Sequence, residues 1–254
     1  MGLFGLFGSK EERARGALQK LAKKITERYG PPENRQKVIG QLGEMGTPEA
    51  LETLCLRFTV RVEPGITDDE EKETTRAILV EVGQTAIPPL EQFVVQHDDG
   101  IAWGLRALAD VAPERVLATV VKELGRLGKI YTRDPEKKLV LLKWLTEHHA
   151  GAGSSPSGAE TEAEAALLPL LEDFSDDVRI SATRALAALA PGEGSRDALI
   201  QLLLRDRENA RVRGEVLDAL AALGADVKGH RPSVEALLVE PFYLDREGRV
   251  KKRT

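Results

Sequence analysis

The chain has 254 residues and a net charge of −5, with 42% apolar and only 4% aromatic residues. This mix, in which leucine and alanine dominate, suits helix–helix packing better than a β-sheet. The single cysteine, Cys55, excludes an internal disulfide framework and is typical of a reducing cytoplasm. No apolar run approaches the roughly 20 residues that cross a bilayer. The start also lacks the pattern of a signal peptide, so we expect a cytoplasmic protein without a transmembrane segment.

Charge is unevenly distributed along the sequence. Residues 1–30 carry seven Lys/Arg against three Glu, a net +4, and residues 241–254 carry a net +3. The remaining 210 residues therefore hold −12. Because such an excess of carboxylates repels the phosphate backbone, nucleic acid is disfavoured as a partner.

The chain opens with four large apolar side chains set among glycines, namely Leu3, Phe4, Leu6 and Phe7. Each glycine weakens a helix by about 1 kcal/mol, so we expect the first helix to begin only at the capping box Ser9-x-x-Glu12. This helix runs to about Tyr29, where Gly30-Pro31-Pro32 ends it.

Residues 1–30 form a basic N-terminal segment that we interpret as a docking element. Its apolar side chains would enter a partner's groove or a membrane surface, and basic side chains such as Lys20, Lys23 and Lys24 would attract anionic lipid. The alternative is that the first eight residues fold back and cap the first repeat. Both interpretations stay open at this point.

Residues 31–149 read as a first set of helical repeats. Thr47-Pro48 is typical of a helix start, and Thr67-x-x-Glu70 is a capping box that predicts another. An irregular insertion at 59–67 separates these two helices. A later helix carries Trp103, for which we favour a core position over stacking on a ligand.

The composition then predicts a flexible linker at 150–160, where glycine and serine dominate. The clearest repeats occupy 161–240, and 241–254 is a tail. Because a terminal repeat needs cover for its open apolar face, we expect Phe242, Tyr243 and Leu244 to cap the last repeat.

Between Asp176 and Gly224 the sequence copies itself after 34 residues. Val178-Arg179 returns as Val212-Arg213, and Ala185-Leu186 returns as Ala219-Leu220. A period in the thirties to forties, with apolar residues at helical spacing, is typical of repeat proteins. We therefore predict an all-α fold, an α-solenoid of antiparallel helix pairs.

The pattern D-x-V-R-x-x-A-x-x-A-L-x-x-L resembles the HEAT-repeat family, including the HEAT-like repeats of bilin lyases, most strongly over residues 161–224. The resemblance implies an armadillo-like helical superhelix in which the second helix of each pair lines the concave face. It also implies a polar ladder between repeats, in which Asp176 or Asp177 would pair with Arg179. The second copy has Arg211 where an acid belongs, so the ladder is not expected to continue there.

Three residues are candidates for partner binding on the concave face. Taking Val178 and Ala182 as buried places Ile180 and Arg184 on the opposite face of their helix. Arg106 corresponds to Arg184 by an offset of 78 residues, or two units of 39. We predict that Arg106, Ile180 and Arg184 contact an acidic or mixed partner surface, with plainly solvated charges as the alternative.

The sequence predicts no catalytic, cofactor or metal site. His148-His149 lacks further ligands at chelating distances in the sequence, and Cys55 stands among leucines as a buried structural thiol does. The di-iron hydroxylases built on HEAT repeats use paired His-Glu dipeptides, and this chain has none. The glycine-rich stretches match no nucleotide-binding loop.

Because HEAT repeats mainly bind proteins, the resemblance implies a non-enzymatic scaffold or adaptor that holds a protein partner in its concave surface. One alternative, carried by the resemblance alone, is a bilin lyase or chromophore chaperone. The other is a nucleic-acid-binding HEAT-like protein, which the net charge of the body disfavours.

Overall fold

The computed structural model describes residues 4–149, 158–189 and 193–253, and at 4–11, 149, 158–161 and 193 it describes the backbone alone. The chain divides into two compact units, Met1–Thr119 and Val120–Thr254. The boundary falls within one helix and does not coincide with the predicted linker at 150–160. Of that linker, 150–157 lies outside the described residues and 158–160 begins a helix.

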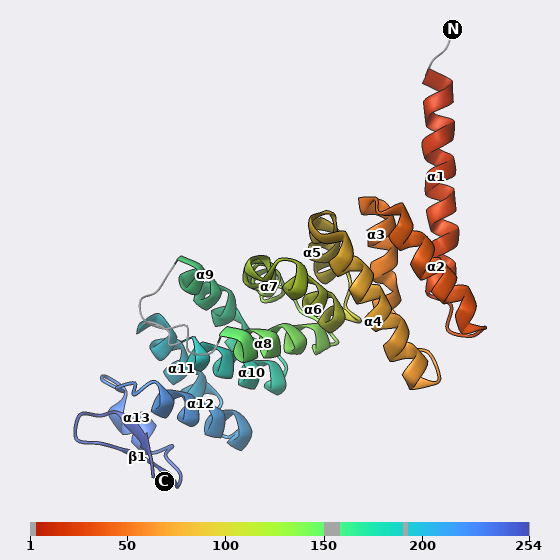
Figure 1. Ribbon diagram of the computed structural model, residues 1–254. Helices are drawn as coiled ribbons and strands as arrows, with labels where there is room; N and C mark the ends of the chain where they lie inside the picture. The colour runs from red at the N-terminus through yellow and green to blue at the C-terminus, as the bar shows by residue number, and fades with distance from the viewer. Residues whose placement is uncertain (1–3, 150–157, 190–192, 254) are drawn as a thin grey trace. The chain divides into compact units, whose positions relative to one another are not determined.

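The first unit is built of helices and short 3₁₀ turns. In order, its elements are α1 (Phe4–Ile25), α2 (Pro32–Met45), α3 (Pro48–Cys55), η1 (Leu56–Thr59), α4 (Gly65–Val82), η2 (Gly83–Ala86), α5 (Ile87–Gln96), α6 (Ile101–Val111) and the first part of α7 (Pro113–Leu127). Short connections fold successive helices back on each other, so that they form two layers (Figure 1). Helices α2, α4 and α6 pack side by side in one layer, and α1, α3 and α5 form the other.

The contact between α2 and α4 depends on a glycine. A Cβ atom added to Gly43 of α2 would lie only 2.6 Å from Cγ2 of Ile78 in α4. The missing side chain therefore lets the two helices approach closely, as small residues do at helix crossings. Any larger residue at position 43 would have to displace the Ile78 side chain or the helix that carries it.

One of the helix starts predicted in this unit is confirmed, and two are wrong. Thr47 caps α3 as predicted, because its hydroxyl accepts a hydrogen bond from the Ala50 amide at 3.3 Å. The capping box at Thr67 was wrong, since α4 already begins at Gly65. The one at Ser9 was also wrong, since α1 begins at Phe4. Extending an existing helix needs no new nucleus, so glycines at its end are tolerated.

The second unit repeats the two-layer plan and ends in a β-hairpin. Its elements after α7 are α8 (Glu136–His149), α9 (Gly158–Leu167), η3 (Leu168–Glu172), α10 (Asp176–Ala188), α11 (Glu193–Arg205), α12 (Ala210–Ala222), α13 (Arg231–Glu235), β1 (Phe242–Leu244) and β2 (Val250–Lys252). Helix α10 packs between α8 and α12, and α11 packs against η3 and α13. The all-α prediction is confirmed, with the hairpin as an addition.

The polar ladder between repeats exists, but its chemistry differs from the family pattern. Arg179 pairs with Asp176 of its own helix at 2.5 Å and with Asp206 at 2.8 Å. Asp177 accepts a hydrogen bond from Arg211 at 2.6 Å. Arg211 is the residue 34 positions later, where we had not expected the ladder to continue. An acid and a base at equivalent positions attract each other across the repeat boundary.

The C-terminal hairpin covers the end of the last repeat. Strands β1 and β2 pair antiparallel, and β2 packs on α12. Val250 of β2 is fully buried. Of the predicted cap, Phe242 and Leu244 are half-buried and Tyr243 is 38% exposed. A backbone hydrogen bond of 3.3 Å from Val250 N to Ala225 O fixes the hairpin to the turn after α12.

The repeat cores predict the stability of leucine variants. Leu186 and Leu220 occupy equivalent positions in two repeats and are both fully buried. Each Leu→Ala substitution should lower the free energy of unfolding by about 2–5 kcal/mol, because it removes apolar contacts and leaves a cavity. Urea unfolding measures this, with Ile130→Ala as the control because Ile130 is 44% exposed. A loss in the control equal to that in the leucine variants would contradict the assignment of the core.

Candidate functional site

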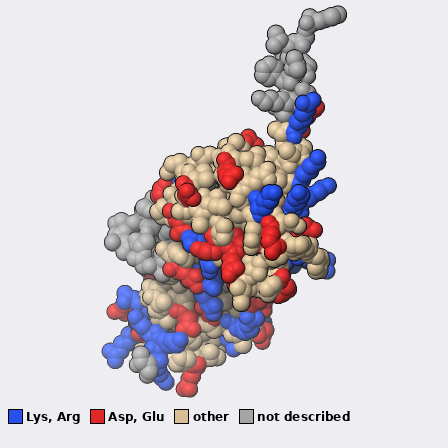
Figure 2. Space-filling view, turned by 45° about the vertical axis from the view of Figure 1, so that its right-hand side comes forward, with Lys and Arg blue, Asp and Glu red and all other residues tan. Residues whose placement is uncertain are grey.

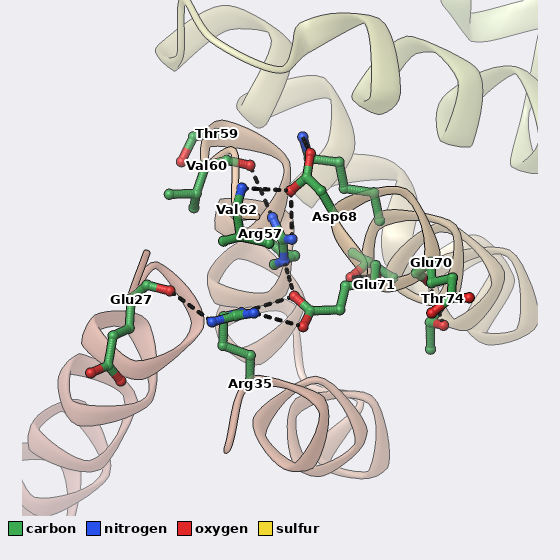
Figure 3. A network of polar contacts seen from close by, with 12 residues as sticks. Glu27, Arg35, Arg57, Thr59, Val60, Val62, Asp68, Glu70, Glu71 and Thr74 are labelled. Carbon is green, nitrogen blue, oxygen red and sulfur yellow. Dashed lines mark hydrogen bonds and ion pairs between the residues drawn. The ribbon is translucent and has the colours of Figure 1, made fainter. Parts of the chain in front are cut away.

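A buried ionic network centres on Glu71 of α4. Its carboxylate accepts hydrogen bonds from Nε and Nη2 of Arg35 in α2, at 2.9 and 3.0 Å, and from Nε of Arg57 in η1, at 2.7 Å. All three side chains are buried: Glu71 is 1% exposed, Arg35 is 2% exposed and Arg57 is 0% exposed. One carboxylate therefore joins three elements, α2, η1 and α4 (Figure 3).

Asp68, one turn before Glu71, extends the network to the chain between η1 and α4. It accepts hydrogen bonds from Arg57 and Lys72, both at 2.7 Å, and from the Val62 amide at 3.1 Å. Arg57 also donates to the Val60 carbonyl at 2.9 Å. The insertion that the sequence marked as irregular is thus held by buried charges.

Buried charges of this kind are costly unless every partner is present. Here each guanidinium meets a carboxylate and also a backbone carbonyl, since Arg35 donates to Glu27 O at 3.2 Å. Removing one partner would leave its neighbours charged and unpaired in the core. The network therefore fixes the rotation of α4 about its axis.

The pKa of Asp68 reflects the opposing effects of burial and of its hydrogen bonds to charged groups. Burial acts to raise this pKa, but hydrogen bonds from Lys72 and Arg57 and the charge of Lys72 outweigh it. The pKa of the Asp68 carboxyl therefore lies below its ordinary value.

Next to the network, α4 lines an open groove with α2 and α6. This α2–α4–α6 groove has a volume of about 910 Å³. Its carboxylates all come from α4, namely Asp69, Glu70, Glu71 and Glu73. The other lining residues are Gln36, Ile39, Thr74, Ala77 and Trp103. Figure 3 shows Glu70 and Thr74 on a different side of α4 from the Glu71 carboxylate.

The carboxylates of the groove differ in their pairing. Glu73 is bound by Arg76, with 3.1 Å between Arg76 Nε and Glu73 Oε2, and this hydrogen bond lowers the pKa of Glu73. Asp69 and Glu70 are exposed, and neither side chain forms an ion pair with any residue that the structure describes. The rim of the groove therefore presents two uncompensated negative charges.

Trp103 of α6 forms the aromatic part of the groove. It is partly buried and stacks on Phe58, with 6.1 Å between ring centroids and 8° between ring planes. The guanidinium carbon of Arg106 lies 5.3 Å from the centroid of the Trp103 ring, which is a cation–π contact. We favoured a core position for Trp103, and the structure places it at the boundary between core and groove.

The three predicted contact residues belong to different units of the chain. Arg106 is exposed beside Trp103 in the first unit, whereas Arg184 is exposed in the second unit and pairs with Glu215 at 2.5 Å. The exposed position predicted for Ile180 was wrong, because this side chain is only 6% exposed. Helix α10 packs on both α8 and α12, so its buried face is wider than one apolar stripe.

The predicted docking segment is only partly described. Leu3 lies outside the described residues, and Phe4, Leu6 and Phe7 lie within α1 without described side chains. The lysines of this segment, Lys20, Lys23 and Lys24, are all exposed. Figure 2 shows basic side chains along the described part of α1. Docking by this segment stays a prediction.

Cys55 is fully buried, as predicted, and burial raises the pKa of its thiol well above its ordinary value. His148 stacks on Trp144, with 4.0 Å between ring centroids. Within the described ranges, no group of three or more His, Cys, Asp or Glu side chains could hold a metal ion.

The network and the groove were missed in the sequence. The spacing of polar residues in α4 could have indicated the network. Asp68, Glu71 and Thr75 follow one another at intervals of three and four residues, which places them on the same helix face as the buried Leu79. Charged residues on a core-facing stripe indicate buried ion pairs. Their partners, Arg35 and Arg57, lie too far away in sequence for spacing to identify.

A family model of HEAT repeats matches residues 164–251. Residues 164–251 are HEAT repeats. The internal copy between α10 and α12 lies inside this HEAT-repeat segment. No curated protein matches the chain.

Among solved structures, human deoxyhypusine hydroxylase in complex with glycerol is similar to the chain at 19% identity. The similarity covers 93% of this chain and 91% of that chain, with a TM-score of 0.30. A TM-score this low is no basis for transferring fold or function.

In the described part of the chain, no helix is long and apolar enough to cross a membrane.

The network predicts an acid-sensitive contribution to stability. Because the folded-state pKa of Asp68 lies below the unfolded value of about 3.9, its stabilisation is complete above that pH and is lost as the pH falls toward the folded-state pKa. Asp68→Asn should therefore be less stable than the parent at neutral pH, and the difference should shrink below about pH 4.

Urea unfolding at a series of pH values measures this difference. The matched control is Asp69→Asn, which changes the neighbouring exposed carboxylate and should shift the free energy of unfolding by no more than about 0.5 kcal/mol. A difference between the parent and Asp68→Asn that stays constant from neutral to acid pH would contradict the account.

Proposed function

We propose that the protein is a non-catalytic scaffold or adaptor that binds another protein through the α2–α4–α6 groove. The observation that carries this proposal is the groove itself, which combines a volume of about 910 Å³ with an aromatic side chain and exposed polar groups. Protein-binding sites commonly combine an aromatic anchor with a polar rim. The HEAT repeats at 164–251 support a binding role, because stacked helical repeats present extended surfaces to partners.

The groove is lined by Trp103 of α6, the helix that also carries the predicted contact residue Arg106. Arg106 belongs to the same helix as Trp103 and is exposed beside it, so it stays a candidate contact. Arg184 belongs to the layer formed by α8, α10 and α12 and stays a candidate contact in its own unit.

The absence of catalysis, of a cofactor and of a resident metal is part of the proposal. The groove carboxylates come from one helix, and the described residues of the lining include no histidine, cysteine or lysine that could act with them as an acid–base pair. Neither a bilin lyase nor a nucleic-acid-binding protein has a specific observation in its favour. The buried thiol of Cys55 is compatible with the reducing cytoplasm that we propose as the location.

A groove-filling variant tests the proposal. Ala77 is exposed in the groove, so Ala77→Trp should block partner entry and leave the melting temperature of the protein unchanged. The retained amount of any groove-bound partner should fall about tenfold or more, equivalent to about 1.4 kcal/mol. Affinity capture on the immobilised full chain measures this loss.

The matched control for capture is Ala118→Trp, which places the same side chain at an exposed position of α7. It should retain the same proteins as the parent. If Ala77→Trp and Ala118→Trp retained equal amounts of partner protein, the proposed role of the groove in binding would be wrong.

A further inference from the structure

We propose that the α2–α4–α6 groove binds a peptide segment that carries lysine or arginine side chains. This inference rests on the proposed protein-binding function of the groove and adds the chemistry of the partner. It differs from the expectation from the sequence, in which Arg106 of this layer contacts an acidic or mixed partner surface.

Charge complementarity is the first support. Asp69 and Glu70 stand exposed on the groove and form no ion pair with a described residue, whereas the neighbouring Glu71 and Glu73 are bound by arginines. A cationic side chain that enters the groove would therefore meet carboxylates that are free to pair with it. An acidic peptide or a phosphate backbone would be repelled by the same two groups.

The uncharged lining of the groove gives further support. Trp103 already has Arg106 over its ring, at 5.3 Å from the ring centroid, and stacks on Phe58, so a partner cation would pair with the rim carboxylates and not with this ring. Thr74 and Ala77 also line the groove, about one and two turns of α4 after Glu70, and both side chains are uncharged. The alkyl stem of a partner lysine or arginine can therefore cover this part of the groove while its head reaches a carboxylate.

The network explains why the two acidic rim residues stay outside. Glu71 turns toward Arg35 and Arg57 in the core, so Glu70, the preceding residue of α4, points to another side of the helix (Figure 3). The arginines of the core cannot neutralise Glu70 without breaking their bonds to Glu71. The negative rim is therefore built into the helix orientation.

A selection from a random peptide library on the immobilised full chain tests this inference. Peptides that Ala77→Trp also retains are discarded, so that only groove-dependent binders remain. We expect lysine and arginine to be at least about twofold enriched over the starting library, because each ion pair adds affinity. Groove-dependent peptides without this enrichment would overturn the inference but keep the proposed function. Recovery of no groove-dependent peptide would overturn both.

The affinity of one selected peptide then tests the named carboxylates. Asp69→Asn combined with Glu70→Gln should weaken binding about threefold to tenfold at low salt, and the loss should shrink as salt screens the charges. The control combines Glu49→Gln with Glu114→Gln, which changes the net charge equally at exposed positions outside the groove. Equal weakening in both double variants would overturn the assignment.

A second copy of the chain is the competing source of the cation, because α1 exposes Lys20, Lys23 and Lys24. Sedimentation of the full chain at low salt distinguishes the two sources. We expect a monomer at all concentrations. A concentration-dependent dimer that the Asp69→Asn/Glu70→Gln variant loses would overturn the inference in favour of self-association.

Discussion

The first unit depends on the pairing of one buried carboxylate, that of Glu71, with Arg35 and Arg57. Apolar packing alone is non-directional and would allow α4 to rotate or slide against its neighbours. Three directed hydrogen bonds to a single carboxylate remove that freedom, since an unpaired charge in the core is strongly destabilising. The same constraint decides which residues of α4 face outward, and so it shapes the groove.

Repetition explains why charged pairs recur at one spacing along the chain. Residues 34 positions apart stand beside each other in neighbouring helices of a layer, as do Arg76 with Asp110 in the first unit and Asp177 with Arg211 in the second. Identical charges at equivalent positions would repel each other across each boundary. The departures of this chain from a strict repeat pattern therefore produce attraction between repeats.

The sequence was sufficient for features that depend on local spacing. The 34-residue copy predicted the helical repeats, and Thr47 predicted the start of α3. It was insufficient where the outcome depends on which distant elements meet. Ile180 is buried because α10 has a neighbour on each side, and Glu71 is paired because α2 and η1 both reach it. Neither fact follows from the residues adjacent in sequence.

The central claim is that adjacent residues of α4 have separate roles, with Glu71 holding the fold and Glu70 serving the groove. Urea unfolding of Glu71→Gln and Glu70→Gln, compared at neutral pH, tests this claim most directly. The account predicts a loss of about 3–5 kcal/mol for Glu71→Gln, because buried Arg35 loses the carboxylate that it binds through two nitrogens and buried Arg57 keeps only Asp68. It predicts a change within about 0.5 kcal/mol for Glu70→Gln, because that side chain is exposed. Equal stability of the two variants would contradict the account.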